Sequence, residues 1–250
     1  MSADPDWPAG VGKHLRTTID STNAEGFRME AVGPAWIVAG EQTAGRGRRA
    51  RPWASPRGNF YGTLVLQPAE PPEVVALRSF VAALALRDAL VALTGLPACL
   101  ALKWPNDVLL NGGKVAGILL ESQSVGAGVQ TLCIGIGVNL IGAPDAAQIE
   151  PGAVPPVSLL AETGLRLTPE AFLNALAPAY AHWERIFTTE GFAPVRAAWL
   201  AHAARLGEPI RARTGTQDRS GTFHTVDAQG NLILGTPHGP VAIPAAEVFF

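Results

Sequence analysis

Arginine and glycine are concentrated in residues 40–61, GEQTAGRGRRARPWASPRGNFY, in a chain with only 16% charged residues. Glycine lets the backbone come close to a ligand, and arginine presents a planar fork of donors that suits phosphate or carboxylate. This composition favours a flexible loop that closes over an anionic ligand. The alternative is an arginine-rich surface loop. The spacing of a Walker A phosphate loop is absent.

A second group of charged residues lies in KWPNDVLLNGGKVAGILLE, residues 103–121. Residues 108–110 and 114–121 read as two strands, joined at residues 111–113 by residues that tolerate positive φ. Alternation along the second strand places Lys114 on the face of Ala116, Ile118 and Leu120. A lysine there can reach a pocket mouth with its stem covered. The alternative is a lysine at a strand end with a weak surface ion pair.

A third strand is expected at residues 131–140, TLCIGIGVNL. Gly135, Gly137 and Asn139 share one face of it because side chains alternate. A face almost without side chains leaves room for a flat ligand, or for close packing of a helix.

The elements that must position these residues indicate an α+β fold, with a mixed or antiparallel sheet flanked by helices. Strands are expected at 14–19, 35–40 and 60–67, and a capping box at Thr22 predicts a helix start. Further helices are expected at 73–94, 158–163, 168–187 with a kink at Pro178, and 192–204. Short β runs fill residues 209–250. We therefore predict two domains, 1–204 and 205–250.

Composition narrows the class of protein. The net charge is −2, which provides no global basic field for nucleic acid. Cys99 and Cys133 lie in apolar runs, as reduced thiols of a cytoplasmic protein do. The N-terminus does not read as a signal peptide, and no apolar run is long enough to span a membrane.

Three motifs occur together in this order: EQTAGRGRR at 41–49, KWPND with GGKVAGIL at 103–119, and GIGVNL at 135–140. With Ser21-Thr22-Asn23 upstream, they resemble the biotin protein ligases, or biotin–[acetyl-CoA-carboxylase] ligases, over almost the whole chain. The resemblance implies a class II synthetase-like catalytic domain followed by an SH3-like β-barrel. It also implies that biotin and MgATP form biotinyl-5′-AMP, which then modifies a lysine of the biotin carboxyl carrier protein.

The resemblance also implies residue roles. Lys114, Arg48 and Asp107 are the expected catalytic residues, with Asp107 steering the acceptor lysine or a Mg²⁺ ion. No protein ligands are assigned to Mg²⁺, which is expected to accompany ATP. The expected biotin contacts are Ser21, Thr22, Asn23, Gln42, Arg46, Gly47, Arg48, Lys114 and Gly117. The expected ATP and adenylate contacts are Arg48, Trp53, Lys103, Lys114 and Asn139.

The chain departs from the family pattern at Ala50, where the loop motif usually has glycine. If that position needs positive φ, alanine costs about 1 kcal/mol. Only 20 residues precede Ser21, so a ligase without a DNA-binding repressor domain, and without specific DNA binding, is expected. The sequence does not decide the oligomeric state, and a homodimer is one option.

Three alternatives remain: a ligase for lipoate or another cofactor acid on the same fold, a nucleic-acid-binding protein, and a non-catalytic biotin-binding module. The pairing of the two glycine-rich motifs argues against the first, and the net charge against the second. Lys103 and Lys114 argue against the third, because storing biotin does not need them.

Overall fold

A seven-stranded mixed sheet forms the centre of the computed structural model, which describes residues 7–29, 33–126, 128–145, 150, 152–215 and 217–250. The strand order is β1-β2-β3-β7-β6-β5-β4, with β1 and β2 parallel and the other neighbours antiparallel. The strands are β1 (Gly12–Arg16), β2 (Ala35–Ala39), β3 (Phe60–Leu66), β4 (Leu100–Lys103), β5 (Asp107–Leu110), β6 (Gly113–Val125) and β7 (Gly128–Val138). The sheet predicted from the sequence is confirmed.

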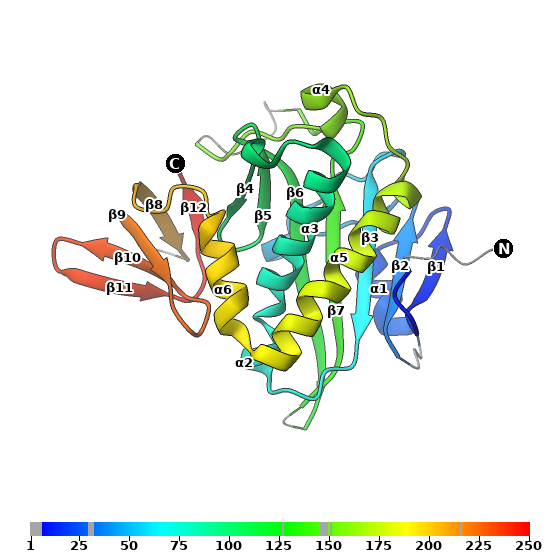
Figure 1. The fold of residues 1–250 in the computed structure, drawn as a ribbon, viewed down its shortest axis with the longest axis horizontal. Helices are drawn as coiled ribbons and strands as arrows, with labels where there is room; N and C mark the ends of the chain where they lie inside the picture. The colour runs from blue at the N-terminus through cyan, green and yellow to red at the C-terminus, as the bar shows by residue number, and fades with distance from the viewer. Residues whose placement is uncertain (1–6, 30–32, 127, 146–149, 151, 216) are drawn as a thin grey trace.

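Helices cover this sheet from two sides (Figure 1). The helices α3 (Arg78–Thr94) and α5 (Pro169–Glu190) lie across one face, with α6 (Phe192–Ala201) beside them. The short helix α1 (Thr22–Arg28) packs on β2, β3 and β7. Two short helices, α2 (Pro72–Val75) and α4 (Leu159–Thr163), complete the described set. Among the described residues, no helix has the length and apolar character needed to cross a membrane.

Strand alternation separates two cores. Ile134, Ile136 and Val138 of β7 belong to the large core under α3 and α5, which also buries Phe60 against Phe172 at 5.0 Å between ring centroids. Cys133 points to the other side and joins a small cluster under α1. Every second residue of β7 therefore faces α1, and this is the face that carries the glycines.

Several local predictions needed correction. The strand expected at 14–19 spans Gly12–Arg16, and the helix expected at 73–94 is divided into α2 and α3. The N-cap of α1 is Ser21, one residue before the predicted Thr22, and its side chain accepts from the Ala24 amide. Strand β4 was not predicted, because three apolar residues before Lys103 do not distinguish a strand from a helix. Helix α5 ends at Glu190 rather than at about residue 187, and Pro178 lies inside it.

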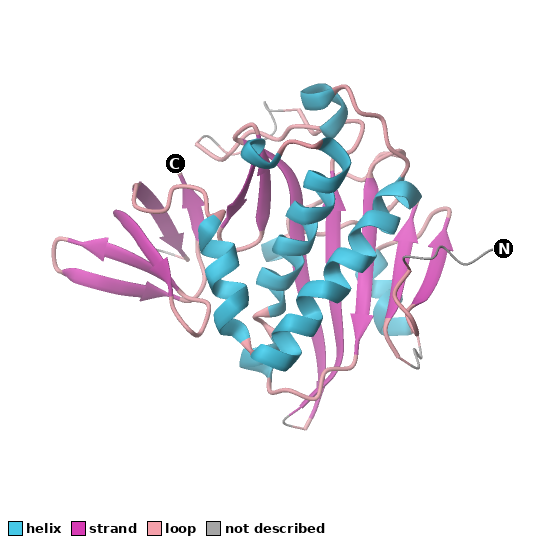
Figure 2. Cartoon of the chain, viewed as in Figure 1, coloured by secondary structure: helices cyan, strands magenta, loops and turns pink. Residues whose placement is uncertain are grey.

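The C-terminal residues form a separate five-stranded antiparallel sheet in the order β11-β10-β9-β8-β12. Its strands are β8 (Pro209–Thr214), β9 (Gln217–Val226), β10 (Leu232–Thr236), β11 (Gly239–Ile243) and β12 (Glu247–Phe249). It stands beyond α6 (Figures 1 and 2) and is consistent with an SH3-like fold. The indole nitrogen of Trp104 donates to the Gly230 carbonyl at 3.1 Å, which ties this sheet to the loop after β4.

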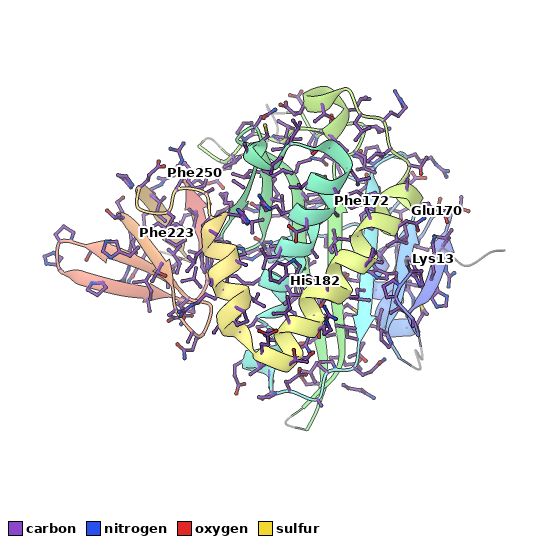
Figure 3. The ribbon with its side chains drawn as sticks, viewed as in Figure 1. Lys13, Glu170, Phe172, His182, Phe223 and Phe250 are labelled. Carbon is purple, nitrogen blue, oxygen red and sulfur yellow. The ribbon has the colours of Figure 1, made fainter. Side chains whose placement is uncertain are left out.

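The opposite edge of the large sheet is held by an ion pair. The ammonium group of Lys13 in β1 lies 2.7 Å from the Glu170 carboxylate in α5 (Figure 3). The five histidines stay outside the site described below. His182, for example, is exposed on α5 (Figure 3) and contacts Trp183.

Candidate functional site

A cavity of about 320 Å³ opens on the face of the large sheet that carries α1. The structure brings all of the site residues expected from the sequence into its lining. They are Ser21, Thr22, Asn23, Gln42, Arg46, Gly47, Arg48, Trp53, Lys103, Asp107, Lys114, Gly117 and Asn139. Residues 246–248 at the start of β12 also line it, so the C-terminal sheet forms part of the wall.

The floor of the cavity is the nearly bare face of β6 and β7. A Cβ added at Gly137 would lie 2.6 Å from the Trp53 ring, and one added at Gly117 would lie 3.2 Å from it. A Cβ at Gly135 would lie 2.5 Å from the Asn23 amide oxygen. Glycine is therefore required here because side chains from the loop and from α1 rest directly on the strand backbone.

One carboxylate between two ammonium groups forms the charged end of the cavity. Asp107 lies 2.7 Å from Lys114 Nζ and 3.5 Å from Lys103 Nζ. Burial opposes ionisation of Asp107, but the two lysines outweigh this and hold its pKa below the usual range. Burial lowers the pKa of Lys103, against the attraction of Asp107. Lys103 is 8% exposed and Lys114 28%, so Lys114 is the cation that a ligand meets first.

The predicted orientation of Lys114 was wrong. A bulge in the β5–β6 ladder pairs Val108 with Ala116 and Leu109 with Lys114. The extra residue reverses the alternation, and the Lys114 side chain lies on the face of Gly117, 3.4 Å from a Cβ built there. The bulge therefore turns the lysine toward the cavity and away from the core face. The Lys114 backbone is anchored as well: its amide donates to the Pro155 carbonyl at 2.8 Å.

Polar side chains at the start of α1 bond to one another. The backbone amide and the hydroxyl of Thr22 donate to the Gln42 amide oxygen at 2.8 and 3.1 Å. The Gln42 amide nitrogen then donates to the Ser55 hydroxyl at 3.1 Å. Ser21 caps the helix. These side chains are consequently held in place by each other, as a preorganised recognition site requires.

Asn23 is held on both sides of its amide. Its oxygen accepts from the Thr63 hydroxyl at 2.6 Å, and its nitrogen donates to Glu121 at 2.8 Å. Glu121 in turn lies 3.3 Å from the Arg46 guanidinium. Glu121 was not expected to take part. Its only sequence signal is that it ends the GGKVAGILLE motif, and a polar residue at a strand end is common.

Asn139 lies at the other end of the bare strand face. Its side-chain nitrogen donates to the Val157 carbonyl at 3.1 Å, and its own carbonyl accepts from the Leu159 amide at 2.8 Å. It therefore fixes the segment before α4 against the cavity wall.

Residues 48–50 of the arginine loop form a 3₁₀ turn at the mouth of the cavity. Arg48 reaches the Asn106 side-chain oxygen at 3.4 Å and the Ala246 carbonyl at 3.3 Å. Burial lowers its pKa, against the attraction of Asp107. Arg49 and Ala50 both have φ of 57°. The loop thus needs positive φ where this chain has alanine, at a cost of about 1 kcal/mol.

The outer arginines of the loop pair with glutamates that the sequence analysis did not single out. Arg49 lies 3.1 Å from Glu247, and Arg51 reaches both Glu247 and Glu150. Glu247 stands almost 200 residues from the loop, so no local pattern connects them.

Comparisons with known proteins identify the family of this chain. The model of the biotin/lipoate A/B protein ligase family matches residues 11–139, and the model of the biotin protein ligase C-terminal domain matches residues 206–250. A biotin–[acetyl-CoA-carboxylase] ligase of Paracoccus denitrificans is 61% identical over 233 residues, which are 92% of this chain and 97% of the relative. The bifunctional ligase/repressor BirA of Bacillus subtilis is 32% identical over 95% of this chain and 74% of its own length.

A solved structure of a biotin protein ligase has the same fold. The biotin protein ligase from Aquifex aeolicus in complex with biotin and ATP superposes with a TM-score of 0.81, at 25% identity, over 95% of this chain and 97% of that one. Two family models match successive parts of the chain, and a relative is 61% identical along nearly its full length. The chain therefore belongs to the biotin protein ligase family.

Proposed function

We propose that this chain is an ATP-dependent biotin–[acetyl-CoA-carboxylase] ligase. It activates biotin as biotinyl-5′-AMP and transfers it to a lysine of the biotin carboxyl carrier protein. The observation that carries the proposal is the meeting of Lys114, Lys103, Asp107 and Arg48 at one end of a cavity floored by glycines. The Paracoccus relative has this activity in its name, and the Aquifex ligase holds both small substrates.

In the first step, a carboxylate oxygen of biotin attacks the α-phosphorus of ATP, and the bond to pyrophosphate breaks. Both reactants are anions, so the barrier falls if fixed cations face the reacting atoms. Lys114 has this role, because it is the more exposed of the two lysines and lies on the cavity side of its strand. Arg48 binds the acyl phosphate that forms and keeps it in the cavity.

The uncharged part of biotin lies toward α1. Ser21, Thr22, Asn23 and Gln42 surround its ureido ring. The hydrogen bonds from Thr22 to Gln42 and from Thr63 to Asn23 fix the positions of their donors and acceptors. Gly117 provides close contact with the ligand. The loop residues Arg46 and Gly47 close over it. On the nucleotide side, Trp53 covers the adenine, and Asn139 and Lys103 complete the contact.

In the second step, the amine of the acceptor lysine attacks the acyl carbon, the bond to AMP breaks, and the amine gives its proton to solvent water. Asp107 steers the incoming lysine. Its carboxylate already faces two ammonium groups in this structure, so it can hold a third in their place.

The residues of the cavity do not fit a resident Mg²⁺ site. Among the described residues, no three His, Cys, Asp or Glu side chains gather as metal ligands would, and Asp107 is occupied by lysines. Mg²⁺ prefers phosphate oxygens and water to an all-protein cage. We therefore assign the ion to the ATP substrate and no protein ligand to it.

The test measures pyrophosphate release from ATP with biotin, and separately with lipoate, followed by transfer of label to a biotin carboxyl carrier protein. Biotin should support both steps and lipoate neither. If pyrophosphate is released with lipoate and ATP but not with biotin and ATP, the chain is instead a ligase for lipoate.

Three further properties belong to the proposal. The two family models match on either side of residues 140–205, which supports a catalytic part up to about residue 204 and a C-terminal part from residue 205. The net charge of −2 supports action without a specific DNA site, and the reduced cysteines support a cytoplasmic location. Light scattering would decide between a monomer and a homodimer.

A further inference from the structure

The outer side of the arginine loop rests on one carboxylate of the C-terminal sheet. Glu247 Oε2 lies 3.1 Å from Arg49, 3.0 Å from Arg51 and 2.7 Å from Arg213. The Glu247 side chain is only 20% exposed, so these pairs are screened less than ordinary surface pairs. Arg213 belongs to β8 and stands opposite Glu247 in the sheet ladder, so it fixes the carboxylate from behind.

The turn that Glu247 holds has an unfavourable backbone. Arg49 and Ala50 both have φ of 57°, a conformation that non-glycine residues keep only when surrounding contacts impose it. The hydrogen bonds inside the loop, such as Gly47 to Arg51 at 2.8 Å, close the turn but do not attach it to the protein. Among the described residues, side chains attach the turn through Asn106, Ala246, Glu247 and Glu150.

The residue directly before β12 also contacts Arg48. The Ala246 carbonyl accepts from Arg48 at 3.3 Å, one residue before Glu247. Ala246 and Glu247 together therefore touch three arginines in the space of four residues, and both line the cavity. The direction of the Arg48 side chain therefore depends on the positions of Arg49 and Arg51, which Glu247 of β12 holds.

We infer that Glu247 is a positioning residue for adenylation. By pairing with Arg49 and Arg51, it keeps the turn in its left-handed conformation, so that Arg48 points into the cavity and toward the reacting phosphate. The inference rests on the role proposed above for Arg48. A purely structural role for Glu247 would be to join β12 to β8 through Arg213, and the test must separate the two.

The first measurement is hydrogen exchange without any ligand. In Glu247→Gln, the amides of Gly47, Arg51 and Trp53 should exchange about tenfold faster than in the parent, because the turn opens more often. The amides of β7 should be unchanged. The matched control is Asp218→Asn, which removes an exposed carboxylate of the same sheet that pairs with Arg211 away from the loop. It should behave as the parent does.

The second measurement is pyrophosphate release with biotin and ATP. Glu247→Gln should lower kcat/KM for ATP about tenfold, which is the effect of a modest loss in transition-state binding. Adding Ala50→Gly should recover part of the loss, since glycine adopts the left-handed conformation without strain. A role confined to the sheet would not respond to a glycine in the loop.

Each outcome is informative. If the parent releases no pyrophosphate, the proposed function fails, while exchange still tests the positioning. An active parent with parental exchange and rate in Glu247→Gln overturns the inference, and so does slowed catalysis that Ala50→Gly does not improve. If Glu247→Gln does not fold, the double variant Arg49→Gln/Arg51→Gln removes the same pairs from the loop side and keeps Glu247 on Arg213. It should show the same faster exchange, and parental exchange there also overturns the inference.

Discussion

The ammonium group of Lys114 lies 2.7 Å from the Asp107 carboxylate, on the side of the sheet that faces the cavity. This contact exists because a bulge directly after the lysine, at Val115, reverses strand alternation. A regular strand would have turned the same side chain toward the buried core.

Replacement of Lys114 should greatly lower the rate of the first chemical step, the formation of the adenylate. We expect Lys114→Ala to lower the rate of adenylate formation about 10²–10³-fold, as when one charge-stabilising donor is lost. Lys114→Arg should restore it only in part, because the planar fork differs from a compact ammonium. Pyrophosphate release without carrier protein isolates this step. If a folded Lys114→Ala variant keeps nearly the parental rate, Lys114 is not the catalytic cation, and Arg48 or Lys103 must supply that charge.

Arg48 should control retention of the intermediate. Loss of a charge-assisted hydrogen bond of about 1.5–3 kcal/mol would speed release of biotinyl-AMP about 10–100-fold in Arg48→Ala. The freed acyl-adenylate should then label lysines of an unrelated bystander protein, which a biotin blot detects. If the variant modifies only the carrier protein, at the parental rate, Arg48 does not hold the acyl phosphate.

Gly137 should tolerate no side chain. The Cβ of Gly137→Ala would lie 2.6 Å from the Trp53 ring, so the indole must move off the strand. We expect KM for biotin or ATP to rise about tenfold or more, because such overpacking displaces a residue of the cavity wall. Gly128→Ala is the control, since it lies in the same strand with no atom within 4 Å of its added Cβ. Equal kinetics for the two variants would contradict the prediction.

The ion pairs of Glu247 should make stability depend on pH. Burial alone would raise its pKa, but hydrogen bonds from Arg51 and Arg213 outweigh this and lower it from 4.5 to about 2. Because the folded pKa is depressed, the stabilisation is complete above about pH 4.5 and is lost as the pH falls toward 2. The parent should therefore be more stable than Glu247→Gln near neutral pH, and the difference should shrink below about pH 4.5. Urea denaturation followed by tryptophan fluorescence at several pH values measures this. A difference that stays constant with pH would show that Glu247 contributes through shape rather than charge.

Local chemistry in the chain was sufficient to predict most of the strands and helices and the bare strand face, whereas the individual site residues were expected from the resemblance to a known family. Alternation along residues 131–140 predicted a bare face, and that face is the cavity floor. Asn111 and Gly112 predicted a hairpin turn, and both have positive φ. Such features follow from neighbours in sequence, whose side-chain directions are dictated by backbone geometry.

Only the tertiary structure decided how the site is held together. The bulge that turns Lys114 depends on the pairing of β5 with β6, and the pairing of Asn23 with Glu121 depends on α1 packing against the sheet. The contact of Glu247 with the arginine loop joins residues almost 200 positions apart. Charges attract without any periodic pattern, so a sequence shows that arginines and glutamates are present but not which of them meet. These ion pairs form only when the C-terminal sheet packs beside the cavity and brings β12 to the loop.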